Sequence, residues 1–216
     1  MGANPYNTKE FKMNTQSDRE IEMKYQAKAD SLAGGIAAMK SIIEFFHYTT
    51  PGGTSTLLEA QALAQPFQDG SSSDHYFAVP DLDGDGSDFI RLRRNHNPKV
   101  LHTLTSKKTD QGDSVNREEI NVSIARDEFH NTRKLLRTTM GPEVLKFVQE
   151  YALFRPDPSV HSLVVSVYTI SISGIVFIEV EGPDLAIVEY WGSVIKPITQ
   201  RQYKNSLWDL FNLGGL

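Results

Sequence analysis

The chain has 216 residues, which is enough for one large domain. It carries 27 acidic and 22 basic residues, a net charge of −5, and this argues against broad, non-specific nucleic-acid binding, which needs a cationic surface. It has no cysteine, so disulfides, thiolate metal sites and a cysteine nucleophile are excluded. No apolar run approaches the ~18 residues of a membrane helix, and residues 1–12 lack the apolar core of a secretory signal. We therefore expect a soluble, cytoplasmic protein.

The first predicted element is a β-strand over roughly residues 18–28. Charged Glu20, Glu22 and Lys24 alternate in it with apolar Ile21 and Met23. A period of two places the charges on one face of the strand and the apolar residues on the other. Two carboxylates and an ammonium group on one face can hold a divalent metal beside an anion. The solvent-facing side of an ordinary sheet would show the same pattern, so both interpretations stay open.

The rest of the chain predicts a mixture of helices and strands in one domain, because no linker or low-complexity tract divides it. One helix is expected after a cap at Asp30 or Ser31, with an apolar stripe from Leu32 to Phe46 and a break at Thr49–Thr54, and a shorter helix is expected at 57–65. Strands are then expected at 75–80, 87–95, 100–106 and 117–125. Two further helices are expected at 127–137 and 142–153. Three more strands (163–173, 175–182 and 186–191) and a terminal helix (198–211) complete the prediction. The fold class is therefore α+β.

Alternating charges recur on the later strands. Arg91 and Arg93 share one face of their strand, and Glu179 and Glu181 share one face of theirs. If all such faces converge, the interior holds five cations and five carboxylates: Lys24, Arg91, Arg93, Lys107 and Arg117, with Glu20, Glu22, Glu119, Glu179 and Glu181.

So many charges would cost several kcal/mol per ion if they were buried dry and unpaired. A closed sheet that is apolar on its outer face, covered there by helices, and wet and charged inside avoids this cost. A polyphosphate would then supply anions for the cations, and a divalent metal would bridge phosphate oxygens to the glutamates. The alternative is an open antiparallel sheet whose mixed charges form ordinary cross-strand pairs facing solvent.

Six short motifs in order, and a seventh near the end of the chain, resemble the CYTH superfamily, the triphosphate tunnel metalloenzymes. E-I-E-M-K at Glu20–Lys24 resembles the signature E-x-E-x-K, and I-R-L-R at Ile90–Arg93 resembles L-R-x-R. The resemblance covers about residues 18–210, and its other elements are D-H-Y-F at 74–77, L-T-S-K at 104–107, R-E-E at 117–119, F-I-E-V-E-G at 177–182 and a final N-S-L-W-D-L at 205–210.

The resemblance implies a single tunnel domain over residues 1–216, an eight-stranded antiparallel β-barrel with helices packed on its outside. It implies a metal-dependent triphosphatase that uses Mg²⁺ or Mn²⁺. The implied metal ligands are Glu20, Glu22, Glu179 and Glu181. Phosphates would be bound by Lys24, Arg91, Arg93, Lys107 and Arg117. The implied catalytic residues are Glu20, Glu22, Lys24 and Glu119, of which Glu119 would ligate a second ion or orient the attacking water.

The sequence also departs from the family pattern. Asn121 replaces a second carboxylate, and Ala78 stands where an aspartate is common. The strand that begins at Leu163 lacks a basic residue, and Ser171 and Ser173 occupy a region where an aspartate is common. Each departure removes a phosphate or metal contact.

Three functions follow as hypotheses. The first is hydrolysis of a linear triphosphate: inorganic triphosphate, a nucleoside triphosphate or an RNA 5′-triphosphate end. The second is a catalytically weak or inactive protein that binds or sequesters nucleotides or polyphosphate, or an RNA end in RNA processing. The third is a scaffold. The sequence is silent on oligomeric state and allows a homodimer, but it supports neither an extended nucleic-acid surface nor a membrane partner.

Two further patterns are weaker. Asp81, Asp83 and Asp85 imitate the start of a calcium-binding loop, but Leu92 stands where the closing glutamate is needed, so a hairpin turn is the simpler prediction. The six histidines show no metal-binding spacing, and we expect them to be surface or packing residues.

Overall fold

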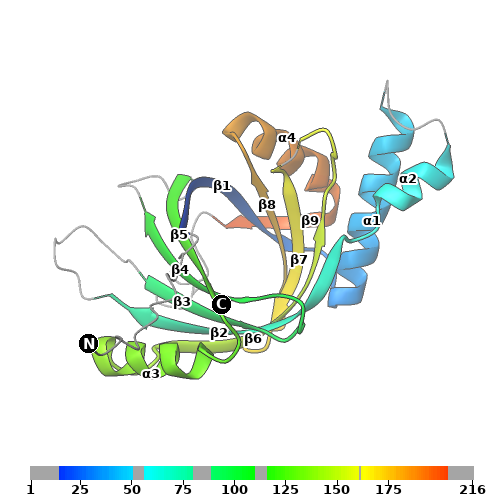
Figure 1. Ribbon diagram of the computed structural model, residues 1–216. Helices are drawn as coiled ribbons and strands as arrows, with labels where there is room; N and C mark the ends of the chain where they lie inside the picture. The colour runs from blue at the N-terminus through cyan, green and yellow to red at the C-terminus, as the bar shows by residue number, and fades with distance from the viewer. Residues whose placement is uncertain (1–14, 51–55, 80–88, 110–115, 161, 204–216) are drawn as a thin grey trace, which may run out of the picture.

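A computed structural model describes residues 15–50, 56–79, 89–109, 116–160 and 162–203 (Figure 1). The side chains of residues 15–20, 107–109 and 116–118 are not described. Within these ranges, no helix combines the length and the apolar character that crossing a membrane requires.

Nine strands and four α-helices make up the described fold. The strands are β1 (Thr15–Ala27), β2 (Gln68–Ala78), β3 (Phe89–Asn95), β4 (His102–Thr109), β5 (Asn116–Ile124), β6 (Leu145–Phe154), β7 (Val164–Ile170), β8 (Val176–Gly182) and β9 (Thr199–Tyr203). The helices are α1 (Leu32–Thr49), α2 (Leu57–Leu63), α3 (Phe129–Met140) and α4 (Leu185–Ile195), and a 3₁₀ turn, η1 (Lys196–Ile198), precedes β9.

All strand pairs are antiparallel, and the sheet curves around a central space (Figure 1). Its order is β5-β4-β3-β2-β6-β7-β8-β1-β9. β1 also pairs with β5 along Thr15–Ile21 and with β8 along Ile21–Gln26, so eight strands follow one another around the interior. β9 is an additional strand beside the second half of β1. The α+β class and the antiparallel tunnel of eight strands are confirmed.

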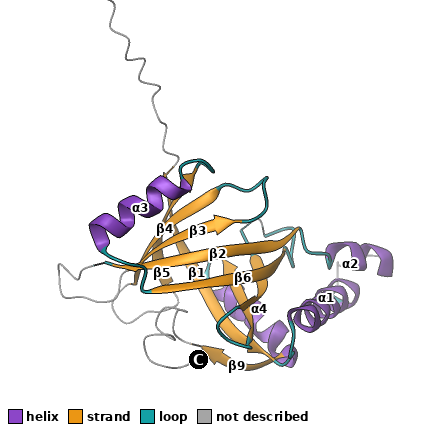
Figure 2. Ribbon diagram, turned by 90° about the horizontal axis from the view of Figure 1, so that it is seen from below, coloured by secondary structure: helices purple, strands orange, loops and turns teal. Residues whose placement is uncertain are grey.

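The apolar outer face of the sheet lies beneath helices, as Figure 2 shows from another side. α1 and α4 pack on β1, β6, β7 and β8 through a buried cluster that contains Met39, Ile43 and Trp191. α3 packs on β2 through Phe129 and Leu136. Burying each large aliphatic side chain contributes ~1.5–3 kcal/mol to the stability of the fold. The helices are therefore held against the outer face of the sheet, and the inner face stays available for the cavity.

Two helical glycines allow α1 and α4 to lie close to the sheet. A Cβ on Gly35 of α1 would lie 2.9 Å from a methyl carbon of Val176. A Cβ on Gly192 of α4 would overlap the hydroxyl oxygen of Tyr25. Real Cβ atoms do not approach so closely, so a larger residue at either position would force the facing side chain or the helix to move.

Three predicted elements are wrong. Residues 142–153, predicted as a helix, form β6; residues 186–191, predicted as a strand, lie in α4. Residues 198–211, predicted as a helix, begin instead with the end of η1 and with β9, and residues beyond 203 lie outside the described part. α4 begins where the Asp184 side chain accepts a hydrogen bond from the backbone N–H of Ile187 at 2.9 Å, an N-cap that overrides the strand preference of the apolar run.

Candidate functional site: a cavity inside the tunnel

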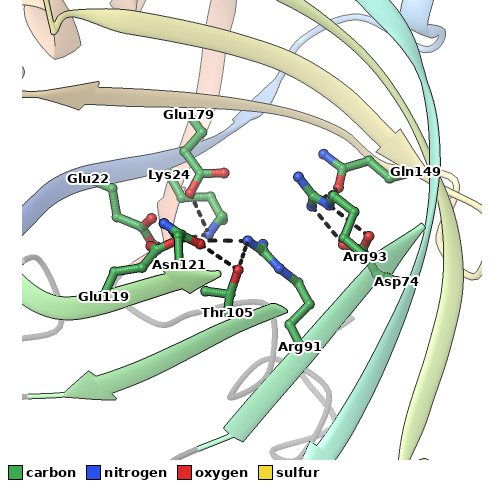
Figure 3. A network of polar contacts seen from close by, with 10 residues as sticks. All are labelled: Glu22, Lys24, Asp74, Arg91, Arg93, Thr105, Glu119, Asn121, Gln149 and Glu179. Carbon is green, nitrogen blue, oxygen red and sulfur yellow. Dashed lines mark hydrogen bonds and ion pairs between the residues drawn. The ribbon is translucent and has the colours of Figure 1, made fainter. Parts of the chain in front are cut away.

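β1 sends its charged side chains inward, as the alternation predicts. Glu22 and Lys24 are buried at 7 % and 5 % exposure on the interior side, whereas Tyr25 and Ala27 belong to the apolar cluster under the helices. Lys24 Nζ lies 3.2 Å from Glu179 on β8 and 3.7 Å from Glu22 (Figure 3). The ammonium group is thereby held between two carboxylates from neighbouring strands.

A second chain of contacts crosses β3, β4 and β5 (Figure 3). Arg91 donates to the Thr105 hydroxyl at 3.2 Å, and this hydroxyl donates to the side-chain oxygen of Asn121 at 2.7 Å. The Asn121 amide donates to Glu119 at 2.8 Å, and Arg91 lies 3.9 Å from the same carboxylate. Asn121, noted as a departure from the family pattern, therefore orients Glu119 and Thr105.

A third group surrounds Arg93 on β3. Its guanidinium donates two hydrogen bonds to Asp74 on β2, at 2.8 and 2.7 Å, and one to Gln149 on β6 at 2.8 Å. Asp74 is fully buried. Burial alone would raise the pKa of the Asp74 carboxyl, but the ion pair and hydrogen bonds with Arg93 outweigh this effect and hold the pKa below its ordinary value. Asp74 is ionised near neutral pH and fixes the orientation of Arg93.

Each of these groups contributes residues to the wall of one cavity of about 400 Å³, a volume typical of small-molecule sites. Two parts of this wall differ in charge. We call the first the charged arc: Glu22, Lys24, Arg91, Arg93, Glu119, Glu179 and Glu181, from β1, β3, β5 and β8. The second, the uncharged arc, comprises Phe67, Gln68, Tyr76, Gln149, Tyr151, Leu153, Val164, Ser166 and Tyr168, which lie on or next to β2, β6 and β7.

The uncharged arc corrects the expectation of an interior that is charged all round. Tyr76, Tyr151 and Tyr168 join a buried cluster with Phe89, Phe147, Ile170, Phe177 and Tyr203 inside the tunnel. Sequence reasoning missed most of this arc because β6 was predicted as a helix. The alternation of inward Phe147, Gln149 and Tyr151 with outward Lys146 and Glu150 was the available signal, but no charge marks the inward face.

Tyr168 is the most buried tyrosine of this arc. Burial raises the pKa of its hydroxyl well above the ordinary value, and the nearby Glu179 carboxylate raises it further. The hydroxyl therefore remains protonated and acts as a neutral hydrogen-bonding group at the boundary with the charged arc.

Of the ten predicted interior charges, seven line the cavity. The side chains of the other three, Glu20, Lys107 and Arg117, are not described, but their backbone positions are. Glu20 pairs with Arg117 between β1 and β5, and Lys107 pairs with Glu119 between β4 and β5. Both pairs lie on the strands of the charged arc or beside them, and the side-chain roles of these three residues stay predictions.

Two of the residues that depart from the family pattern do not lie on a strand of the tunnel. Ser171 and Ser173 follow the end of β7, where the Ser171 hydroxyl accepts a hydrogen bond from the backbone of Val148. The prediction that they remove a tunnel contact is therefore wrong. Ala78 ends β2 and packs against the interior aromatic cluster. β7 presents Val164, Ser166 and Tyr168 to the cavity, none of them basic, in agreement with the sequence.

The donors in the charged arc fit a divalent metal that arrives with an anionic ligand. Among the described lining residues, four carboxylates outnumber three cations, so an added anion needs another positive charge. Within the part of the chain with described side chains, no three acidic, histidine or cysteine residues gather closely enough to hold an ion by themselves. Mg²⁺ commonly needs only one or two protein carboxylates when phosphate oxygens complete its shell. Glu22, Glu179 and Glu181 supply such oxygens.

Two of the described histidines are packing residues, in agreement with the prediction. His75 and His102 are buried beneath α3, and both rings contact Phe129 edge-on, at centroid distances of 5.8 and 5.0 Å. The aspartates at 81, 83 and 85 lie outside the described residues.

Comparisons with known proteins place the fold. No family model matches the sequence, and no curated protein matches it significantly. Among solved structures, the PH1819 protein of Pyrococcus horikoshii OT3 is 18 % identical with a TM-score of 0.62, over 90 % of this chain and 99 % of that one.

Two bacterial structures, each named a "putative adenylate cyclase", are also similar. The protein from Vibrio parahaemolyticus is 13 % identical with a TM-score of 0.58, over 91 % of this chain and 99 % of its own. The protein from Bacillus halodurans is 16 % identical with a TM-score of 0.57, over 90 % and 98 %. At these identities the likeness shows the fold alone: an antiparallel sheet curved into a tunnel with helices on its outer face, the architecture that the sequence predicts.

Proposed function

We propose that the cavity binds the phosphate chain of a triphosphate together with Mg²⁺ or Mn²⁺ and hydrolyses it. The observation that carries this proposal is the convergence of cations and carboxylates from β1, β3, β5 and β8 on one cavity of about 400 Å³. Nucleotide chemistry in the names of two similar structures agrees with it. Positioning and electrostatic stabilisation are what phosphoryl transfer chiefly requires of a protein.

In this proposal the phosphates replace carboxylates as partners of the cations. Lys24 lies 3.2 Å from Glu179, so a phosphate oxygen that takes Lys24 releases that carboxylate for the metal. Glu22, Glu179 and Glu181, with Glu20, would hold the ion, which when bound supplies charge neutralisation and a more acidic water. Arg91 and Arg93, with Lys107 and Arg117, would hold the phosphate oxygens.

We assign to Glu119 the role of orienting and deprotonating the attacking water. Asn121 fixes its carboxylate through a hydrogen bond of 2.8 Å, so it can accept a proton from a water aligned with the terminal phosphorus. The water oxygen forms a bond to that phosphorus while the bond to the bridging oxygen breaks. The products are orthophosphate and the shortened phosphate chain, which takes the electron pair of the broken bond.

The test is phosphate release from tripolyphosphate and nucleoside triphosphates with Mg²⁺ or Mn²⁺. Glu22→Gln should lower turnover by a factor of ~10²–10³, as loss of one group that stabilises developing charge does. Glu150→Gln, an exposed carboxylate on the outward side of β6, is the matched control and should be unaffected. No phosphate release with any metal from any of these compounds would refute hydrolysis.

A second candidate is binding without turnover, including sequestration of a nucleotide or polyphosphate or of an RNA 5′ end. The observation that favours it is Arg93, whose guanidinium already donates twice to the buried Asp74 and once to Gln149. This cation is committed to its neighbours, which weakens its use in catalysis. Calorimetric binding of a triphosphate without phosphate release would select this candidate over the first.

A further inference from the structure

The uncharged arc contains a continuous patch that the phosphates of the proposed ligand would not use. Gln68 lies opposite Leu153 between β2 and β6, and Leu153 lies opposite Ser166 between β6 and β7. The backbone N–H of Phe67 donates to Leu153 at 2.9 Å, and the Gln68 amide donates to the Tyr151 hydroxyl at 3.2 Å. The patch is therefore one surface made by three adjacent strands.

Among the described residues that line the cavity, the cations Lys24, Arg91 and Arg93 all belong to the charged arc, and the patch adds none. Arg155 lies over the ring of Phe67 and is not one of the lining residues. A phosphate group moved onto the patch would lose hydration without gaining an ion pair from the cavity wall, which is unfavourable. A wholly inorganic triphosphate therefore has no use for this side of the cavity.

The same patch suits a flat, uncharged ring. Leu153 and Val164 are half-buried and keep part of their apolar surface toward the cavity, and Phe67 is 46 % exposed. The Arg155 guanidinium lies 4.6 Å from the centre of the Phe67 ring and fixes its orientation. Gln68 and Ser166 add neutral hydrogen-bonding groups of the kind that recognise ring nitrogens and carbonyl oxygens.

We propose that the ligand is an organic triphosphate whose heterocyclic ring lies against the patch formed by Phe67, Gln68, Leu153, Val164 and Ser166. This inference rests on the proposed function, because the charged arc must hold the phosphates. It selects nucleoside triphosphates over inorganic triphosphate. Ring recognition comes from β6, β7 and the start of β2, and phosphate binding comes from the cations on β1 and β3.

The test compares three probes with Mg²⁺ by isothermal titration calorimetry: ATP, CTP and tripolyphosphate. In the unmodified protein we expect at least one nucleotide to bind ~10-fold or more tightly than tripolyphosphate, since a buried apolar contact of this size contributes a factor of that order. Leu153→Ala should remove most of this advantage while changing the affinity for tripolyphosphate less than about twofold. Val148→Thr, on the outward face of the same strand, is the matched control and should change neither.

The outcomes separate this inference from the function on which it rests. If tripolyphosphate binds as tightly as both nucleotides, or if Leu153→Ala weakens all three probes equally, the ring site is refuted and triphosphate binding stands. If none of the three binds, the proposed function itself fails. Val164→Thr changes almost no volume and gives the same comparison if Leu153→Ala does not fold; a preserved nucleotide advantage in the folded variants would overturn the assignment.

Discussion

The charged arc and the uncharged arc use the same strand geometry but hold their side chains in different ways. In the charged arc, each described cation has a carboxylate partner, for example Lys24 with Glu179 and Arg93 with Asp74. A phosphate must exchange with those partners, so part of its binding energy is spent on breaking existing pairs. In the uncharged arc, tyrosines rest on a packed aromatic cluster behind them. A ligand can contact that surface without displacing protein groups, which makes it the better source of selectivity.

The largest expected effect comes from removing Asp74, where the two arcs meet. Asp74→Ala leaves Arg93 without its buried partner and should lower the free energy of unfolding by about 3–5 kcal/mol. Urea denaturation monitored by circular dichroism measures this loss. The double variant Asp74→Ala/Arg93→Met should be more stable than Asp74→Ala alone, because the uncompensated charge is gone. If the loss of unfolding free energy in the double variant equals the sum of the losses in the two single variants, Asp74 and Arg93 are not coupled.

The interior also shows how far sequence patterns reach. Alternating charges at 20–24, 90–93 and 177–182 predict the inward faces of β1, β3 and β8, because side chains two positions apart on a strand lie on the same face of the sheet. β6 escaped prediction because its inward residues are aromatic or neutral and carry none of the alternating charges that mark β1, β3 and β8. Lys146 and Glu150 alternate on its outward face, but Val148 and Ala152 beside them weaken the contrast. The charged arc was therefore predictable, and the uncharged arc was not.

A smaller effect is expected within the charged arc at Thr105. Thr105→Val keeps the shape but removes the hydroxyl that joins Arg91 to Asn121 through bonds of 3.2 and 2.7 Å. Leaving those buried polar groups unsatisfied should cost about 1–3 kcal/mol of stability. It should also lower the rate of phosphate release, because Asn121 then orients Glu119 less firmly. Thr169→Val, away from the cavity on β7, removes a single hydrogen bond to the backbone oxygen of Ile175 at 3.2 Å and shows in the same denaturation assay what the loss of one isolated hydroxyl contact costs.

The uncharged arc should respond more mildly to loss of one polar atom. Tyr151→Phe removes the hydroxyl that accepts a hydrogen bond from Gln68 at 3.2 Å, but the ring and its packing remain. We expect a loss of about 1 kcal/mol or less, measured as a shift in the urea midpoint at constant slope. A loss above that of Thr105→Val would contradict the view that packing, rather than hydrogen bonding, holds this arc.

The smallest expected effect is a pH dependence of the free energy of unfolding, caused by His75 on β2 and His102 on β4. Burial lowers the pKa of His75 and of His102, and neighbouring cations, chiefly Arg133 for His75 and Arg126 for His102, lower both further. The unfolded chain therefore binds more protons than the folded one just below pH ~6.5. Stability is fully present above that pH and declines as pH falls toward the lowered pKa values. His75→Gln/His102→Gln should flatten the stability profile between about pH 7 and 5, and an unchanged slope would exclude these histidines as its cause.

The aromatic cluster behind the cavity affects how a ligand can enter and leave the tunnel. Phe147, Ile170, Phe177 and Tyr203 are each at most 6 % exposed and fill the interior next to Tyr168. These packed side chains narrow the interior beside Tyr168, so we expect a ligand to leave by the route through which it entered. In that case a long polymer would insert one end rather than be threaded through, and a cleaved phosphate and the larger product would share one exit.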